Sequence, residues 1–523
     1  MNRFSRKMIL PALCGGAMLC AAPPRFLDAG ALTAAAAGPE KSVSGDAPCW
    51  RFAPKFPGQQ LAGTVRDIPK ECGGVRIRLH LAVPAGSAIP AGAETVWAVR
   101  INQGGKEPDF SGVAVEGAPI RVPVSPAGTR QIVTAETYYP VDPARPLAVQ
   151  VERRTADPAD TCPAPADLLG VEVRFLPPPA PPVVVENSPG YNAWPIIQTL
   201  GDKAVCAYSR GKGHFVTEVE RDAYLRISRD GGKTWGPEQC WYANPNECVG
   251  ACARGLDETG ALLFWVRCWG PGTPRRFELY RSTDGTRFEK ISEPRFDPLP
   301  MQIMDVVRIP GKGLLCLWFA GNYKRDDGSN CWGTLFSADD GRTWTQKTVE
   351  RGLPGNDWPT ESSAVYLGDG RILALVRIEG RGDTTDHAQF QLQSEDFGAT
   401  WSKAKTNITD VLVSTPSLIL DRERGLLHCY YFYRGRGLLN RRTAALRTIW
   451  DHPLAWPEPE TVALGKPDVS DSGNVSAIAV GERHLLAYYM GNETDAAVVT
   501  AIIPATPPNK NGTDAEPRKE TRK

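Results

Sequence analysis

Four short stretches of this chain share one pattern: Ser228-Arg-Asp-Gly-Gly-Lys-Thr-Trp235, Ser282-Thr-Asp-Gly-Thr-Arg-Phe288, Ser337-Ala-Asp-Asp-Gly-Arg-Thr-Trp344 and Ser394-Glu-Asp-Phe-Gly-Ala-Thr-Trp401. Their first residues lie 54, 55 and 57 positions apart. One unit of about 55 residues is therefore repeated, and such a period is typical of a propeller, a solenoid or an array.

The chemistry of the repeat predicts a tight turn between two strands. Gly can take a positive φ angle, and the Asp carboxylate can accept hydrogen bonds from backbone N–H groups. The Trp or Phe that closes the pattern is expected to fasten the turn to the next strand. We therefore interpret the Ser, Asp, Gly and aromatic residues of all four copies as structural.

The pattern resembles the Asp-box of the sialidase (neuraminidase) superfamily. Three copies match the form Ser-x-Asp-x-Gly-x-Thr-Trp in full, and the second copy, Ser282–Phe288, is degraded. The resemblance implies a six-bladed β-propeller whose Asp-boxes lie on the outer rim, away from the active site. It therefore indicates a fold more strongly than it indicates a function.

The expected fold class is all-β, with a β-sandwich-like accessory domain before the propeller. Residues 38–178 contain short runs of alternating apolar and polar side chains, such as Val75–Leu81 and Val96–Ile101, which predict half-buried strands in two packed sheets. We interpret this domain as a carbohydrate binder or a packing partner. Residues 179–189 are expected to be a Pro-rich linker and a propeller-closing strand, and residues 190–504 the catalytic propeller.

The last blade of the propeller is expected to be incomplete. The 314 residues from Tyr191 to Pro504 are too few for six full units of about 55 residues. We expect Pro182–Glu186 to cross over and supply the missing strand, which would leave no open sheet edge. No turn would then exist at the place of a sixth Asp-box.

The two ends of the chain are expected to be a leader and a polar tail. Residues 1–37 are expected to be a signal peptide and leader, because a basic start precedes the apolar run Met8–Ala22. Residues 505–523 are expected to be disordered. We therefore predict a secreted, periplasmic or cell-surface bacterial protein. The balance of 60 Lys and Arg against 59 Asp and Glu favours neither a nucleic-acid partner nor membrane insertion.

Four arginines occupy the ends of successive second strands: Arg210, Arg267, Arg377 and Arg434. The third blade has Asn322 at this place. A converging set of guanidinium groups is costly to assemble unless it holds an anion, and Arg can grip a carboxylate through two parallel hydrogen bonds. The alternative is that each Arg is a solvated strand end.

The first blade adds His214 and Glu218 near the same face. A buried carboxyl group has a raised pKa and could protonate the oxygen of a leaving group. Alternatively, Glu218 forms a salt bridge with Arg221. Further acid or base candidates begin innermost strands (Asp305, Glu361 and Asp471), and His387 and Gln389 could bind sugar hydroxyls.

The sialidase resemblance implies an arginine triad that recognises the carboxylate of sialic acid. One departure is clear, because Trp194 stands where the family has the Arg of an Arg-Ile-Pro motif, so the chain looks like a divergent bacterial branch. The usual Tyr nucleophile cannot be carried over either. Retaining and inverting hydrolysis therefore stay open. We expect Glu218 to be one catalytic carboxyl group and Asp305 or Glu361 the other.

The leading hypothesis is a secreted exo-sialidase that hydrolyses terminal sialic acids of glycans or glycoproteins, without a cofactor or a metal. A second hypothesis is an exo-glycosidase for arabinan or a uronate, since Arg would grip a uronate equally well. A third is a propeller that binds glycans without cleaving them.

Overall fold

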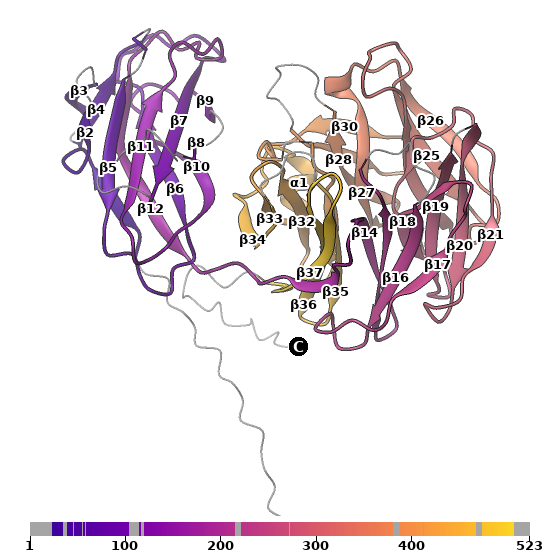
Figure 1. Cartoon of the computed structure of the whole chain (residues 1–523). Helices are drawn as coiled ribbons and strands as arrows, with labels where there is room; N and C mark the ends of the chain where they lie inside the picture. The colour runs from indigo at the N-terminus through magenta and orange to yellow at the C-terminus, as the bar shows by residue number, and fades with distance from the viewer. Residues whose placement is uncertain are drawn as a thin grey trace, which may run out of the picture. The chain divides into compact units, whose positions relative to one another are not determined.

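The computed structural model describes residues 23–34, 39–44, 47–54, 56–57, 59–103, 115–116, 120–214, 221–270, 272–379, 388–411, 413–466 and 473–506. The chain divides into two compact units, Met1–Pro178 and Pro179–Lys523 (Figure 1). The prediction of an all-β fold is confirmed, because the described part contains strands besides one short helix, α1 (Leu446–Asp451), and one 3-10 turn (Gly355–Asp357). No described helix is long and apolar enough to cross a membrane.

The first unit is a sandwich of two antiparallel sheets, as the alternating runs predict. Its core contains side chains from both sheets, and the rings of Phe52 and Trp97 meet edge to face with their centroids 5.0 Å apart. One sheet consists of β1 (Arg25–Asp28), β3 (Glu40–Ser44), β4 (Ala47–Phe52), β6 (Gly74–Ala82), β10 (Gln131–Pro140) and β12 (Ala166–Leu176). The other consists of β2 (Thr33–Ala34), β5 (Gln60–Val65), β7 (Glu94–Asn102), β8 (Val115–Glu116), β9 (Ile120–Pro123) and β11 (Leu147–Arg153).

The second unit has a β-propeller fold built from groups of antiparallel strands. Figure 1 shows β14, β18 and β27 near the middle of this unit and β21 at its outer edge. The first three groups are β14 (Tyr191–Leu200), β15 (Lys203–Gly211), β16 (Asp222–Ser228) and β17 (Gln239–Tyr242); β18 (Cys248–Leu256), β19 (Leu262–Gly270), β20 (Thr273–Ser282) and β21 (Glu289–Ser292); and β22 (Gln302–Ile303), β23 (Val307–Ile309), β24 (Gly313–Ala320), β25 (Cys331–Ser337) and β26 (Thr345–Arg351).

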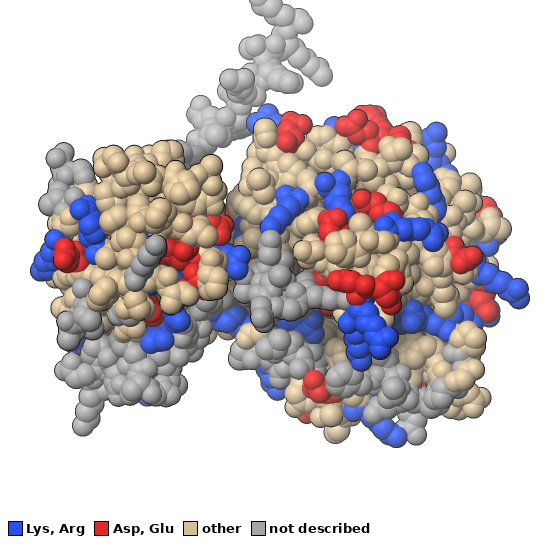
Figure 2. Space-filling view, turned by 90° about the horizontal axis from the view of Figure 1, so that it is seen from above, with Lys and Arg blue, Asp and Glu red and all other residues tan. Residues whose placement is uncertain are grey.

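The remaining groups follow the same order from the innermost to the outermost strand. They are β27 (Pro359–Gly368), β28 (Arg371–Ile378), β29 (Phe390–Ser394) and β30 (Ser402–Lys405); β31 (Ser417–Asp421), β32 (Leu426–Tyr433), β33 (Leu438–Ala445) and β34 (Glu460–Leu464); and β35 (Val475–Val480), β36 (Arg483–Gly491) and β37 (Ala496–Pro504) with β13 (Val183–Glu186). Figure 2 shows basic and acidic side chains intermixed over this unit, so no large field of one sign covers the face in view.

The last group takes its outermost strand from the start of the unit. β13 pairs antiparallel with β37, so that Val183 lies opposite Thr500. β14 and β37 also meet through a parallel pair, Tyr191 and Ala496, which joins the first and last groups into one eight-stranded sheet. The first and last groups therefore meet side by side, and β13 supplies the strand that the sequence predicts to cross over.

Serine side chains link neighbouring innermost strands. The N–H of Leu418 on β31 donates to Ser363 Oγ on β27 over 3.0 Å. Ser417 Oγ accepts from Ala477 N on β35 over 3.0 Å, and Ser476 Oγ accepts from Ile197 N on β14 over 3.0 Å. These bonds satisfy backbone donors at the centre of the unit and hold the strands that carry the candidate site.

The four repeats form the predicted turns. In the third, Gly341 has a φ of 87°, its N–H donates to Ser337 Oγ over 2.8 Å, and the N–H of Thr343 donates to Asp339 Oδ1 over 2.8 Å. The closing Trp344 contacts Trp265 of the preceding blade, with the ring centroids 5.2 Å apart. This contact between neighbouring blades was not predicted from the sequence, which indicated only that the aromatic residue fastens the turn to the next strand.

The fifth group has a helix where the first four have a repeated turn. α1 follows β33, and its carbonyl groups accept hydrogen bonds from the preceding blade: Gln391 Nε2 donates to Ile449 O over 2.8 Å, and Gln393 Nε2 donates to Trp450 O over 2.7 Å. The buried Ile449 packs in the same core cluster as Leu375 of β28. The helix thus closes the space between these blades without an Asp-box.

Candidate active site

Three of the four predicted arginines lie in one neighbourhood at the ends of second strands. Arg267 lies on β19, Arg377 lies on β28, and Arg434 directly follows β32. Arg377 and Arg434 both lower the pKa of the Glu361 carboxyl group. Glu361, Arg377 and Arg267 in turn influence the pKa of one phenol, Tyr323. The charges from these three strand ends are therefore close enough to act on each other.

Arg377 is held between two carboxylates. Its Nη1 lies 2.9 Å from Glu361 Oε2, and its Nη2 lies 2.8 Å from Glu379 Oε2. All three side chains keep less than a fifth of their surface exposed. Hydrogen bonds between ionised groups are stronger than neutral ones, particularly where water is largely excluded. Arg377 therefore fixes the direction of Glu361.

Glu361 also contacts the following blade, through Thr415. The hydroxyl of Thr415 donates to Glu361 Oε2 and lies 2.9 Å from Asn474 Oδ1. Burial alone would raise the pKa of Glu361, but Arg377, Thr415 and Arg434 outweigh it, and the pKa is lowered. Glu361 is therefore a carboxylate at neutral pH, which suits a general base and excludes the role of a proton donor.

Tyr323, which follows β24, packs against this pair. Its ring centroid lies 6.0 Å from Arg377 Cζ and 5.5 Å from the ring of Trp358. Burial raises the pKa of the phenol, and Glu361 raises it further, while Arg377 and Arg267 oppose them. The phenol therefore stays protonated. Among the described residues, no hydrogen bond joins Tyr323 to Glu361.

Arg267 has a neighbour that the sequence did not single out, Arg275. Arg267 Nη1 donates to Gln302 Oε1 over 2.9 Å and to Met301 O over 3.2 Å, and Arg275 Nη1 donates to Pro300 O over 2.8 Å. Burial lowers the pKa of Arg275, and Arg267 lowers it further. Arg275 lies near the start of the third strand β20, a position at which the sequence pointed to Glu218, His387 and Gln389 in other blades but not to this arginine.

Asp305 has an arginine partner of its own, Arg254. Its Oδ2 lies 3.6 Å from Arg254 Nε, and its Oδ1 accepts the Arg254 N–H over 3.2 Å. Burial raises the pKa of Asp305, although Arg254 opposes the shift. Both Arg267 and Asp305 influence the pKa of the Cys252 thiol, so the two charges flank one side chain. Asp305 is therefore the candidate that best suits a proton donor among the described carboxyl groups.

Arg210 does not join this cluster, and here the expected ring of four arginines is wrong. Its Nη1 donates to Glu238 Oε2 over 3.0 Å, its Nη2 lies 3.2 Å from Glu186 Oε2, and its Nε donates to Asn192 Oδ1 over 2.7 Å. Its Cζ lies 4.5 Å from the ring centroid of Tyr224. Arg210 is thus bound by carboxylates on the outermost strand β13 and directly before the outermost strand β17.

Trp194 and His214 form an aromatic cluster at the start of β14. Trp194 lies in an irregular stretch of the pairing with β15 and has a φ of 55°, which is strained for a bulky side chain. The Cζ of Arg221 lies 4.5 Å from the Trp194 ring centroid, and Tyr191 Oη lies 2.7 Å from His214 Nδ1. His214 is thus held in an aromatic environment.

Gln389 is not part of the candidate site. Its side chain is fully buried, and its Oε1 lies 3.8 Å from Cys429 Sγ. A side chain with no exposed surface cannot contact a sugar, so the prediction for Gln389 is wrong. Glu218, His387 and Asp471 lie outside the described residues.

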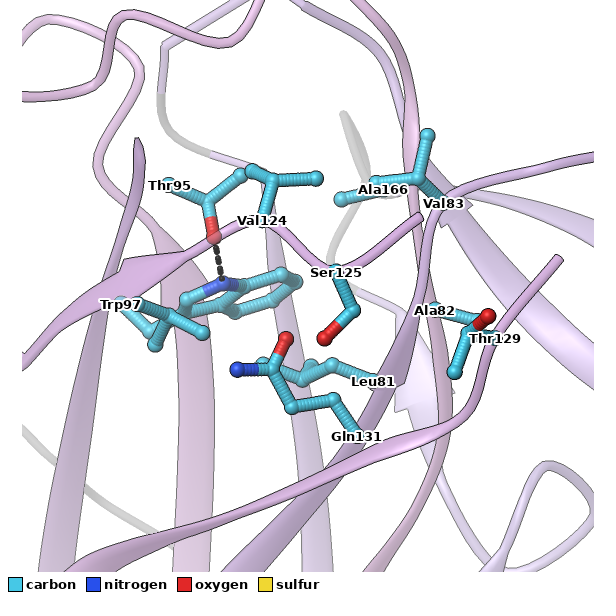
Figure 3. A pocket seen from close by; sticks show the side chains of 11 residues that line it. Leu81, Ala82, Val83, Thr95, Trp97, Val124, Ser125, Thr129, Gln131 and Ala166 are labelled. Atoms are coloured by element: carbon cyan, nitrogen blue, oxygen red, sulfur yellow. Dashed lines mark hydrogen bonds between the residues drawn. The ribbon is translucent and has the colours of Figure 1, made fainter. Parts of the chain in front are cut away.

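The cavity in Figure 3 lies in the sandwich and not at this site. It is bounded by residues that include Leu81, Trp97, Val124 and Gln131, and it has a volume of about 10 Å³, room for a single water molecule. Thr95 Oγ1 accepts a hydrogen bond from Trp97 Nε1 beside it. A larger hollow of about 330 Å³ lies at the first repeated turn, beside Asp230, Lys233 and Arg483. In the part of the chain that the structure covers, no group of three His, Cys, Asp or Glu could hold a metal ion.

Comparisons with solved structures agree with the propeller architecture. A protein of unknown function from Dyadobacter fermentans matches with a TM-score of 0.51 and 18% identity over 62% of this chain and 98% of that one. The fold is shared. The Hadza microbial sialidase Hz136 matches with a TM-score of 0.49 and 15% sequence identity, over 87% of this chain and 99% of that one. Trypanosoma rangeli sialidase matches with a TM-score of 0.47 and 13% sequence identity, over 62% of this chain and 60% of that one.

No family model and no curated protein sequence matches the chain. At 18% identity, the likeness to the Dyadobacter protein shows the fold alone.

Proposed function

We propose that the propeller unit is a glycoside hydrolase that removes a terminal carboxylated sugar from glycans or glycoproteins, with sialic acid as the first candidate. The observation that carries this proposal is the ion pair between Arg377 and the ionised Glu361, with Arg434 acting on Glu361 and Arg267 acting on Tyr323, which packs against Arg377. Guanidinium groups suit a carboxylate ligand, and a carboxylate beside them suits acid and base chemistry. The Asp-box pattern adds the resemblance to sialidases.

In this proposal, Glu361 is the general base. Its lowered pKa keeps it ionised, and Arg377 and Thr415 fix its direction. A Tyr nucleophile needs a base within hydrogen-bond reach, and the partners of Glu361 in the described residues are Arg377 and Thr415 rather than Tyr323, so we favour an inverting reaction in which Glu361 activates a water molecule. Glu218 or Asp305 would protonate the leaving oxygen, and the raised pKa of Asp305 supports the second choice.

A fluorogenic sialoside tests the proposal. We expect the wild-type protein to release the fluorophore and the Glu361→Gln variant, with an unchanged melting temperature, to be at least about 100-fold slower. NMR of the freshly released sugar should show the inverted anomer. Release by neither protein from sialosides, uronides or arabinan would reject the hydrolase.

One observation favours a second candidate, a propeller that binds acidic glycans without cleaving them. Glu361 is already engaged by Arg377 and Thr415, and Trp194 occupies the place where the sialidase resemblance expects an arginine. Binding on a glycan array without release of sugar would support this candidate. An exo-glycosidase specific for a uronate or arabinan would instead release those sugars and leave sialosides intact.

The basic and apolar start of the chain supports a further part of the proposal, export from the bacterial cytoplasm. A fusion of residues 1–37 to a periplasmic reporter enzyme tests it. The reporter should be active outside the cytoplasm, and a fusion in which Arg3, Arg6 and Lys7 are replaced by Glu should remain inside.

A further inference from the structure

The guanidinium groups of the site differ in whether carboxylates or neutral oxygens are their partners. Arg377 has two carboxylate partners, Glu361 and Glu379, with N–O distances of 2.9 and 2.8 Å. Its positive charge is therefore already compensated. A substrate carboxylate that approached Arg377 would have to displace one of these glutamates or tolerate their repulsion.

Arg267 and Arg275 stand in the opposite situation. Their side-chain hydrogen bonds go to Gln302 Oε1 and to the carbonyl groups of Pro300 and Met301, and within the described chain neither forms an ion pair with a carboxylate. Both side chains are half-buried. Each is thus held by neutral oxygens that fix its direction, and no carboxylate of the described residues compensates its charge.

The two like charges also act on each other. Burial lowers the pKa of Arg275, and the field of Arg267 lowers it further, so the pair is held together against repulsion. Bringing two half-buried cations together is unfavourable unless an anion neutralises them. A carboxylate lying between two guanidinium groups would do so through charge-assisted hydrogen bonds.

The pair is also next to the proposed chemistry. Arg267 influences the pKa of Tyr323, which packs on Arg377, and both Arg267 and Asp305 influence the pKa of Cys252. The flat face of the Arg267 guanidinium rests on Trp269, with Cζ 4.4 Å from the ring centroid.

We infer that Arg267 and Arg275 form the seat for the carboxylate of the substrate, and that Arg275 is a specificity-determining residue of this site. The inference rests on the proposed function. Arg377 then acts as a positioning residue that orients Glu361, rather than as the principal contact of the substrate carboxylate. The ligand class is an acidic sugar, and a neutral sugar or a methyl ester of the acid would lack the group that this pair recognises.

The test compares three variants on a fluorogenic sialoside and on its methyl ester. Arg275→Met removes the positive charge. Arg275→Lys keeps a positive charge but lacks the planar guanidinium group that can form two parallel hydrogen bonds. Arg308→Met is the matched control, because Arg308 is an exposed arginine on β23 that donates to the carbonyl of Asp257. Melting temperatures establish that each variant is folded.

We expect Arg275→Met to raise KM for the acid by about 10- to 100-fold, with a smaller change in kcat, because a hydrogen bond to a charged group is lost. Arg275→Lys should recover part of this loss, and Arg308→Met should resemble the wild type. KM for the methyl ester should be nearly the same in all proteins. Calorimetric titration with free N-acetylneuraminic acid should show the same order of affinities without any turnover.

The outcomes separate the inference from the proposed function. If the wild type cleaves or binds the acid and Arg275→Met does so with the same KM or affinity, the inference is wrong and the proposed function stands. If Arg275→Met is folded and loses the acid and the ester equally, Arg275 is not a carboxylate seat. If the wild type neither cleaves nor binds acidic sugars, the proposed function fails, and the inference fails with it.

Discussion

The first and fourth blades place the same residue at the same strand position and use it differently. Arg210 and Arg377 both lie at the end of a second strand, and each meets two carboxylates. The partners of Arg210 are Glu186 on β13 and Glu238 next to β17, at the outer strands. The partners of Arg377 are Glu361 on the innermost strand β27 and Glu379.

The innermost strand explains the difference. Opposite Arg210 lies Asn192, a neutral side chain that accepts a single hydrogen bond from Arg210 Nε. In the fourth blade, the innermost strand supplies the carboxylate Glu361, which holds Arg377 and also meets Thr415 and the field of Arg434. The position of the carboxylate partners therefore decides the role of an arginine at a strand end. With partners at the outer strands it stabilises the fold, and with a partner on the innermost strand it belongs to the candidate site.

The largest effect is expected for a substitution of Glu361, the carboxylate that holds Arg377 in the candidate site. The Glu361→Gln variant should lose at least about 100-fold in kcat on a sialoside, because the general base is gone. The matched variant Glu186→Gln should keep its kcat within a few fold. Steady-state kinetics on both variants at the same pH make the comparison, and equal losses would remove the distinction between the two blades.

The two arginines should separate activity from stability. Arg377→Met should lower kcat, because Glu361 loses its orientation. Arg210→Met should leave kcat nearly unchanged and lower the free energy of unfolding by about 2 kcal/mol, less than for a fully buried pair because Arg210 and Glu238 keep about a fifth of their surface exposed. Urea titrations and initial rates measure the two quantities, and a catalytic defect in Arg210→Met would contradict the account.

Glu186 should make the first blade sensitive to acid. Burial alone would raise its pKa, but hydrogen bonds from Ser188 and Arg226 outweigh it and lower the pKa below its ordinary value near 4.3. A lowered folded pKa contributes stability above the unfolded pKa, and this contribution disappears as the pH falls toward the folded value. The free energy of unfolding should therefore decline between pH 5 and about pH 2.5, and less steeply in Glu186→Gln.

The smallest effect is expected at a repeated turn, remote from both arginines. Asp339→Asn weakens the hydrogen bonds from Thr343 and should cost about 1 kcal/mol of unfolding free energy, with unchanged KM and kcat. This variant is a control for the whole comparison. A loss of activity beyond the loss of folded protein would mean that the repeated turns act on the site.

Most of the architecture could be predicted from the sequence because it depends on local rules. Ser337, Asp339 and Gly341 encode a turn within a few residues, and alternating runs such as Val75–Leu81 encode strands. The interruption of the repeats in the fifth blade could not be interpreted in the same way, because α1 packs against Gln391 of another blade. The sequence predicted neither a helix nor a repeated turn at this place.

The candidate site was predicted only in part, for a physical reason. Spacing identifies which residues arrive at one edge of the blades, and Arg267, Arg377, Arg434 and Glu361 were found in this way. It does not show where a long guanidinium side chain points, so Arg210 was assigned to the wrong cluster. The prediction for Gln389 was wrong because a neighbouring blade buries this side chain, and the sequence pattern of its own strand does not reveal that burial.

The central claim is that this face recognises a negatively charged sugar. The most direct measurement is the ratio of kcat/KM for a fluorogenic sialoside to kcat/KM for its methyl ester, with the wild-type protein. The account predicts that the acid is cleaved at least about 10-fold more efficiently, because the ester cannot form charge-assisted bonds with the arginines. Equal efficiency for the two substrates would contradict the claim.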